Sequence, residues 1–135
     1  MQEKIKTSEI IYKITIPLPP ITKKNSQQII YNKKLQRAMI IQSKQYRKYE
    51  KSCKEYIKPI KTIAEPVEIK CLFYMPTRRR VDLTNLEEAI DDILVKYKII
   101  DDDNYKILVS HDGSRVYYDK ENSRTEIEIR RIENV

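Results

Sequence analysis

The sequence predicts an α+β fold in which a small, mixed and mostly antiparallel sheet packs against two main helices. Two kinds of apolar periodicity support this prediction. Alternation with a period of two recurs in the segments 10–18, 67–75 and 125–132 and is typical of strands. Apolar residues spaced by three and four occur in the stretches 43–58 and 83–97 and are typical of amphipathic helices. Helices mixed with mostly hairpin-linked strands indicate an α+β domain.

The first strand is expected at residues 10–18, which are rich in β-branched side chains. Pro17, Pro19 and Pro20 end it, because proline cannot donate to a strand ladder. The polar run 21–26 is then expected to form an exposed loop.

A short second strand is expected at residues 28–31, followed by a turn at 32–34. The first helix is expected to have Ser43 as its N-cap and to end before Pro59. Its tyrosines are interpreted as core residues, in preference to groups that stack on bases. The faces around them are basic.

The second helix is the clearest element of the sequence. It follows the strand 67–75, which ends at Pro76, and Asp82 stands at its N-cap position. Its apolar stripe is formed by Leu86, Ala89, Ile90, Ile93, Leu94 and Tyr97.

Two further strands are expected at 105–110 and 115–118, on either side of the dipeptide Asp112-Gly113. This dipeptide is a strong hairpin-turn signal, so the two strands are expected to pair. The last strand is expected at 125–132, with Ile127, Ile129 and Ile132 on its apolar side.

The length of 135 residues suits a single domain over 1–135, with residues 1–8 as a flexible N-terminal segment. The net charge of +7 favours a polyanionic partner, above all nucleic acid, although solubility alone is an alternative explanation.

Several classes of protein are disfavoured. Cys53 and Cys71 belong to no CxxC pair and are expected to be reduced thiols in a cytosolic chain. His111 is the only histidine, which argues against zinc sites built from His and Cys and against a Ser-His-Asp triad. The sequence shows neither a membrane-spanning stretch nor a secretion signal, and we expect no membrane association and no small-molecule cofactor.

Asp82 is the first candidate for chemistry, because it stands between Arg78, Arg79, Arg80 and the second helix. A carboxylate can face DNA phosphates when a divalent cation lies between them, and Mg²⁺ prefers such oxygens. The alternative is a helix N-cap, and the two roles compete for the same oxygens.

Asp101, Asp102 and Asp103 follow the second helix. They are either a solvated acidic turn or, as a hypothesis, a group that the returning strand brings back towards Asp82. Along the helix, Asn85, Glu88 and Asp92 are expected on one flank. Glu88 and Asp92 repel each other mildly at i and i+4, and a metal or a basic partner would relieve this repulsion.

Basic side chains in the N-terminal half are candidate phosphate contacts, with ordinary solvated side chains as the alternative. They are Lys23, Lys24, Arg37, Lys44, Arg47 and Lys48.

The run Arg80-Val81-Asp82-Leu83-Thr84-Asn85-Leu86, followed by a helix and by Ile100-Asp101-Asp102-Asp103-Asn104, resembles the RusA-like crossover junction endodeoxyribonucleases. Pro19-Pro20 followed by Lys24-Asn25-Ser26 is similar to the N-terminal loop of that family, and the resemblance extends over about residues 14–130. It implies a dimeric, Mg²⁺-dependent enzyme that cuts four-way DNA junctions by paired incisions, of a kind frequent in prophages.

The resemblance also implies site residues. Asp82 matches the first aspartate of the family pattern, and Asp103, after Asp102, matches its catalytic acid. Thr84 stands where a second aspartate is expected, and Glu88 where a lysine is expected. One possibility is that the Thr84 hydroxyl and the Glu88 carboxylate compensate for the missing aspartate, which would leave Asp82, Glu88 and Asp103 around one cation. The alternative is that the site is weakened.

The sequence therefore predicts an endonuclease acting on Holliday junctions or other branched DNA as a homodimer, in the cytoplasm of a bacterial or phage-infected cell. Its cofactor is expected to be Mg²⁺, with Mn²⁺ as a substitute. A branched-DNA-binding module without cleavage and a protein-binding adaptor are the alternatives. The predicted catalytic residues are Asp82, Asp103, Asp102 and Glu88, the metal ligands Asp82 and Asp103, the DNA contacts Lys23, Lys24, Asn25, Arg78, Arg79 and Arg80, and the supporting residues Thr84 and Asn85.

Overall fold

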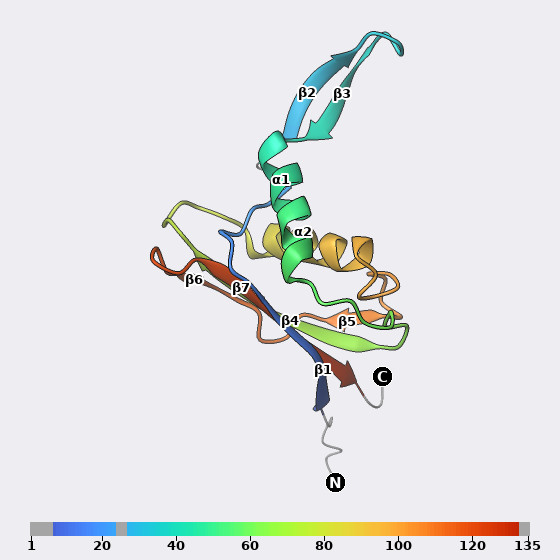
Figure 1. Cartoon of the computed structure of the whole chain (residues 1–135), viewed down its shortest axis with the longest axis vertical. Helices are drawn as coiled ribbons and strands as arrows, with labels where there is room; N and C mark the ends of the chain where they lie inside the picture. The colour runs from blue at the N-terminus through green and yellow to red at the C-terminus, as the bar shows by residue number, and fades with distance from the viewer. Residues whose placement is uncertain (1–6, 24–26, 133–135) are drawn as a thin grey trace.

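A computed structural model describes residues 7–23 and 27–132 of the chain. Two helices lie on one face of a five-stranded sheet, and a separate two-stranded hairpin projects away from this sheet (Figure 1). The predicted α+β class is confirmed. The elements in chain order are β1 (Thr7–Ile16), β2 (Gln27–Asn32), β3 (Arg37–Gln42), α1 (Lys44–Cys53), the 3-10 turn η2 (Lys54–Tyr56), β4 (Val67–Met75), α2 (Leu83–Lys96), β5 (Leu108–Ser110), β6 (Arg115–Tyr118) and β7 (Arg124–Ile132).

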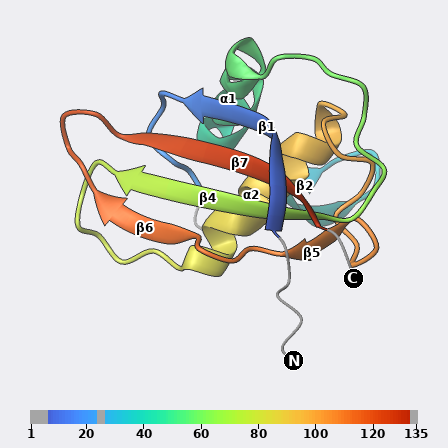
Figure 2. The same ribbon diagram turned by 90° about the horizontal axis from the view of Figure 1, so that it is seen from below.

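The sheet has the order β1-β7-β4-β5, and β6 also pairs with β4. The long pairs β1–β7 and β7–β4 are antiparallel, whereas β5 and β6 run parallel to β4. Figure 2 looks onto the uncovered face of this sheet, with both helices behind it.

Alternation along β4 explains why the helices cover only one face. Val67, Ile69, Cys71 and Phe73 are fully buried, and the residues between them are half-buried. Burying one such large side chain contributes roughly 1.5–3 kcal/mol. The same face of β7 buries Thr125, Ile127 and Ile129. Ile132 has the opposite parity and is only half-buried, so its predicted place on the apolar side is wrong.

β1 begins earlier than predicted and is irregular at its start. Thr7 and Ser8 already belong to the strand, which shortens the predicted flexible segment, and residues 1–6 lie outside the described residues. Register shifts lie between Thr7 and Tyr12, and they leave Ile10 47% exposed while Ile11 packs against the core. Regular alternation holds only from Tyr12 onwards.

The predicted hairpin around Asp112-Gly113 is wrong. β5 and β6 both pair with β4, one after the other, so the turn interrupts a single edge strand. The hydroxyl of Ser114 accepts a hydrogen bond from the Cys71 N–H (2.9 Å). This backbone donor of β4 therefore has a partner at the point where the edge strand is interrupted. Gly113 has φ +83°. This turn geometry is compatible with an interruption within one strand as well as with a hairpin.

α1 begins as predicted. The Ser43 hydroxyl accepts a hydrogen bond from the Tyr46 N–H (3.1 Å), and Tyr46 and Tyr49 are buried, which confirms their interpretation as core residues. The α-helix ends at Cys53, before η2, and therefore earlier than predicted. Cys53 and Cys71 are free and buried.

α2 ends in a Schellman motif without a glycine. Lys98 has φ +60°, the Ile99 N–H donates to the Leu94 carbonyl (2.9 Å), and the Lys98 N–H donates to that of Val95 (3.1 Å). Ile99 and Leu94 are both fully buried, as the motif favours. Within the ranges 7–23 and 27–132, no helix combines the length and the apolar character needed to cross a membrane.

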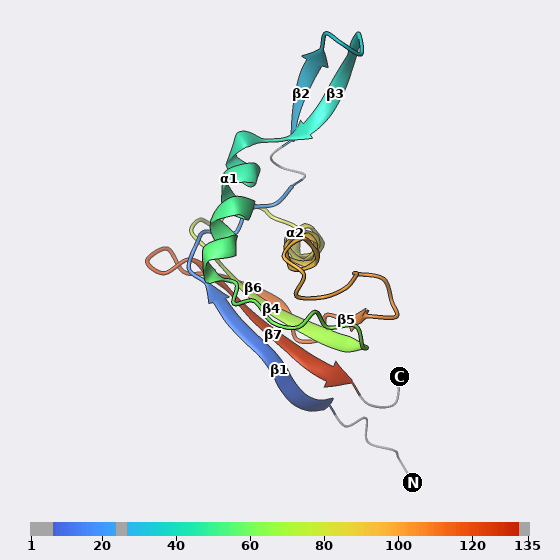
Figure 3. The same cartoon turned by 45° about the vertical axis from the view of Figure 1, so that its right-hand side comes forward.

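β2 and β3 form a hairpin of which only β2 was predicted. Their pairing runs in register from Gln27 opposite Gln42 to Asn32 opposite Arg37. The Asn32 side chain accepts a hydrogen bond from the Leu35 N–H (3.0 Å) and so closes the turn. The hairpin extends beyond the end of α1, away from the sheet (Figures 1 and 3).

Candidate nucleic-acid and metal-binding site

The loop between β4 and α2 collects three predicted DNA contacts. Arg78, Arg79 and Arg80 are exposed in residues 77–81, which we call the arginine loop. The Arg78 guanidinium lies 4.2 Å from the centre of the Tyr118 ring, a contact that orients it. The loop leads into the N-terminus of α2, where the helix dipole adds positive potential. This end of the helix is therefore favourable for phosphate groups.

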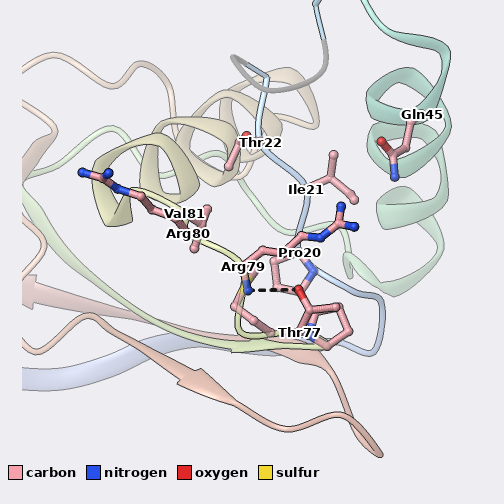
Figure 4. A pocket seen from close by; sticks show the side chains of 10 residues that line it. Pro20, Ile21, Thr22, Gln45, Thr77, Arg79, Arg80 and Val81 are labelled. Carbon is pink, nitrogen blue, oxygen red and sulfur yellow. Dashed lines mark hydrogen bonds between the residues drawn. The ribbon is translucent and has the colours of Figure 1, made fainter.

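A shallow hollow of about 370 Å³ lies between the arginine loop, the segment after β1 and the start of α1. Figure 4 shows Arg79 extending towards Ile21 and Gln45, while Arg80 extends to the other side. The Arg79 N–H donates to the Thr77 hydroxyl (3.4 Å), which fixes the start of the loop. The hollow is thus lined by apolar side chains together with Arg79 and Arg80, and its lining reaches Val81, next in sequence to Asp82.

Asp82 occupies the N-cap position of α2 without capping the helix through its side chain. It is exposed, and among the described residues its carboxylate accepts a single, long hydrogen bond, from the Asn85 amide (3.4 Å). Of the two roles that the sequence left open, the cap is therefore not the one adopted by the carboxylate. Its oxygens stay available to a cation or to solvent.

Thr84, Glu88 and Asp92 follow at four-residue steps on α2 and form what we call the polar stripe. Thr84 and Glu88 are exposed, and Asp92 is half-buried. The ammonium group of Lys23 forms an ion pair with the Asp92 carboxylate and also lies over the ring of Tyr46. The basic partner expected to relieve the Glu88–Asp92 repulsion is therefore Lys23.

This ion pair bears on the exposure predicted for Lys23. The side chain is only 23% exposed and is engaged with α2, so its predicted exposure is wrong, whereas its contact with DNA stays a prediction. The segment after Pro20 passes between α1 and α2, which the sequence pattern did not reveal. The predicted contacts Lys24 and Asn25 lie outside the described residues.

The three aspartates after α2 are exposed, and the last two have different environments. The Asp102 carboxylate accepts hydrogen bonds from the Asp103 N–H (2.8 Å) and the Asn104 amide (2.9 Å), which lower the pKa of Asp102. Partial burial, a hydrogen bond with Asp102 and the negative charges of Asp92 and Asp102 raise the pKa of Asp103. Asp103 therefore lies within electrostatic reach of the C-terminal half of α2.

The predicted cluster of Asp82, Glu88 and Asp103 around one cation is not formed in a single chain. Among the residues that the structure describes, no three His, Cys, Asp or Glu side chains are close enough to hold a metal. α2 has 14 residues and is therefore about 21 Å long, with Asp82 before its first turn and Asp103 after its last. Asp103 interacts electrostatically with Asp91 and Asp92, in the C-terminal half of α2.

A buried pair that the sequence reasoning missed anchors α2 to the sheet. The two ring nitrogens of His111 lie 2.9 Å from the Asp91 carboxylate and 2.9 Å from the Ile69 carbonyl. Because the carbonyl can only accept, Nδ1 carries a proton, and Nε2 and Asp91 share a second one. Asp91 is only 8% exposed, and its other carboxylate oxygen has no hydrogen-bond partner in the ranges 7–23 and 27–132.

Both members of this pair have a raised pKa. Burial raises that of Asp91, although the hydrogen bond and the charge of His111 oppose it. Burial lowers the pKa of His111, but Asp91, with a contribution from Glu87, outweighs this effect and the net shift is upward. The sequence contains a signal for this pair, because Asp91 lies between Ile90 and Ile93 of the apolar stripe, and a buried acid requires a partner.

The chain is a small basic α+β domain. It has exposed carboxylates along α2 and arginines next to the N-terminus of this helix. This combination indicates a class of protein suited to phosphodiester substrates. The family model described as Endodeoxyribonuclease RusA matches residues 17–130. A search of curated proteins found no match. The chain belongs to the RusA endodeoxyribonuclease family, which confirms the predicted resemblance, and the family supports an endonuclease that resolves Holliday junctions.

Proposed function

We propose that the chain is a metal-dependent endonuclease that cuts Holliday junctions and other branched DNA. The observation that carries the proposal is the placement of Asp103, the residue matching the family's catalytic acid. Its carboxylate is exposed in the turn after α2, beside Asp101 and Asp102. A divalent cation can lie between such an exposed carboxylate and the phosphates that a basic protein binds.

Asp103 and Asp82 are the proposed ligands. Both present exposed carboxylate oxygens, the donors that Mg²⁺ prefers, and Mg²⁺ commonly takes one or two carboxylates while waters and substrate phosphates complete its shell. A bound Mg²⁺, or Mn²⁺ in its place, supplies an activated water and stabilises charge on the phosphoryl oxygens. Because α2 separates the two acids, Asp82 serves a second ion or a site completed by another subunit.

The remaining site residues have supporting roles in this proposal. Asp102 holds the Asp103 backbone through its hydrogen bond and is a positioning residue. Glu88 supplies a further exposed carboxylate on the polar stripe, and the Asn85 amide donates a hydrogen bond to Asp82. Lys23 forms an ion pair with Asp92 in the free chain, and a cation bound in its place would leave Lys23 free to bind a phosphate.

DNA is held by the arginine loop at the other end of the helix. A homodimer with two-fold symmetry would match the symmetry of a four-way junction and allow paired cuts. The buried free thiols of Cys53 and Cys71 suit the reducing cytoplasm of a bacterial or phage-infected cell.

The test is cleavage of a synthetic four-way junction with Mg²⁺ or with a chelator. Asp103→Asn and Asp82→Asn should each reduce the rate by about 100-fold or more, since each removes a charge from the proposed metal sites. Asp101→Asn is the matched control, because it removes an exposed acid of the same turn and should cleave normally. Cleavage that is indifferent to both substitutions would refute the mechanism.

One alternative outcome has a specific basis in the chain. Thr84 and Glu88 depart from the family pattern, and no three-acid group occurs among the described residues. Tight, salt-dependent junction binding without a Mg²⁺-dependent product would identify a branched-DNA-binding module with a weakened site.

A further inference from the structure

The β2–β3 hairpin, residues 27–42, forms an arm that pairs with no other described strand. Figures 1 and 3 show it projecting from the helical side of the sheet, beyond the N-terminus of α1. A free two-stranded ribbon is marginally stable in water, so an arm of this kind is expected to gain stability from a partner.

Large apolar side chains of the arm are exposed to solvent. Ile29 is 76% exposed, Tyr31 63%, Leu35 52% and Ile30 42%. Tyr31 is paired with Ala38 in the ladder, close to the turn. These side chains contribute nothing to the core of the domain, and their exposure indicates a contact surface.

The arm belongs to the most basic part of the chain. Residues 10–49 contain nine Lys or Arg and no Asp or Glu, a net charge of +9. The whole chain carries +7, so the remaining residues carry +7 minus +9, or −2. Lys33, Lys34 and Arg37 are exposed on the arm, and Lys44 and Arg47 continue the exposed charge along α1. This charge is complementary to nucleic-acid phosphates.

The shape of the arm also favours nucleic acid. The major groove of B-DNA is about 12 Å wide and admits a two-stranded β-ribbon. Six-residue strands extend about 20 Å, which is long enough to follow a groove or enter a branch. If the arms of two copies packed together, their Lys and Arg side chains would repel each other, because residues 27–42 contain no Asp or Glu to pair with them.

We propose that the arm is a DNA-binding ribbon that distinguishes branched from linear DNA, an inference that rests on the proposed function. Lys33, Lys34 and Arg37 contact phosphates, while Tyr31 and Ile29 contact base faces at the branch point. Stacking is interrupted there, so apolar side chains reach bases without the unstacking of a few kcal/mol per step that a linear duplex requires.

Two arm variants separate the charged from the apolar contribution. The first replaces Lys33, Lys34 and Arg37 by Gln. The second combines Tyr31→Ser with Ile29→Ser. A matched control replaces Lys58, Lys61 and Lys120, which are exposed lysines outside the arm and α1, by Gln and so makes the same change in net charge.

The readout is the dissociation constant for a four-way junction and for a linear duplex, over a series of salt concentrations. The charge variant should weaken both, and the slope of log K against log salt should fall by about 0.9 for each phosphate that the protein no longer neutralises. The apolar variant should weaken junction binding by about 10-fold, since base–aromatic stacking contributes about 1–3 kcal/mol, with little effect on the duplex. All variants should keep the wild-type melting temperature, because the arm lies outside the core.

Three results would overturn the inference. Arm variants that bind the junction like the control show that the arm does not touch DNA, even if the wild type cuts normally. An arm variant that changes the sedimenting mass from dimer to monomer assigns the arm to contacts between copies. A wild-type chain that binds no DNA would refute the proposed function and the arm proposal together. Normal cleavage by the wild type, with unchanged junction binding by the arm variants, would refute the arm proposal alone.

Discussion

His111→Gln tests the buried pair that ties α2 to the sheet. The amide can replace a hydrogen bond to Asp91 but not the positive charge, and one buried oxygen of Asp91 already lacks a partner within the described part of the chain. Hydrogen bonds to charged groups contribute about 1.5–3 kcal/mol, and the His111 side chain is only 19% exposed. We therefore expect the substitution to lower the free energy of unfolding by about 2 kcal/mol at pH 6.

The pair also makes stability depend on pH. The pKa of His111 is raised, so the folded state binds its proton more tightly than the unfolded state. This contribution is fully present below the unfolded pKa of about 6.5 and is lost as the pH rises through the folded pKa. Each unit of upward shift is worth about 1.4 kcal/mol, and the raised pKa of Asp91 acts in the same direction.

Urea unfolding followed by circular dichroism between pH 6 and 8.5 measures both effects. The wild type should lose stability across this range, and His111→Gln should show a flatter profile. Adding Asp91→Asn should recover part of the loss, because it removes the uncompensated charge. A His111→Gln variant with wild-type stability at pH 6 and the same slope with pH would refute this account of the pair.

The other predictions concern the backbone, the core and the metal. Lys98→Gly should raise the unfolding free energy by up to about 1 kcal/mol, because the residue has φ +60° and the left-handed conformation costs about 1–2 kcal/mol with a side chain. Gly113→Ala, at φ +83°, should lower it by about 1–2 kcal/mol. Phe73→Ala should lower it by about 3–5 kcal/mol by opening a cavity in the core. Urea titrations check all three, and an unchanged midpoint would contradict each. Mn²⁺ should raise the melting temperature of the wild type more than that of Asp103→Asn, and equal shifts in a thermal scan would speak against Asp103 as a ligand.

Much of the fold could be predicted because its central elements have regular periodicity. β4 alternates without interruption, and α2 has an apolar stripe of four turns, so both were predicted almost to the residue. The edge elements could not be predicted in the same way. A dipeptide such as Asp112-Gly113 specifies a local turn, but the partner of the next strand depends on β4, about 40 residues earlier in the chain.

The sequence predicts the candidate site as a set of residues, but it does not predict how the fold arranges them in space. Sequence placed Asp82 and Asp103 at the two ends of α2, but whether the chain returns to bring them together is a property of the whole fold. The ion pair of Lys23 with Asp92 and the contact of His111 with Asp91 join residues 69 and 20 positions apart. No local pattern encodes such distances, although the buried acid Asp91 signalled the need for a partner.

The position of the cation tests the central claim most directly. Crystals of the protein soaked in Mn²⁺ would locate bound ions by their anomalous scattering. We predict an ion coordinated directly by a carboxylate oxygen of Asp103, with Lys23 displaced from Asp92. Ions bound only away from both Asp103 and Asp82, in a protein that still cuts branched DNA, would contradict it.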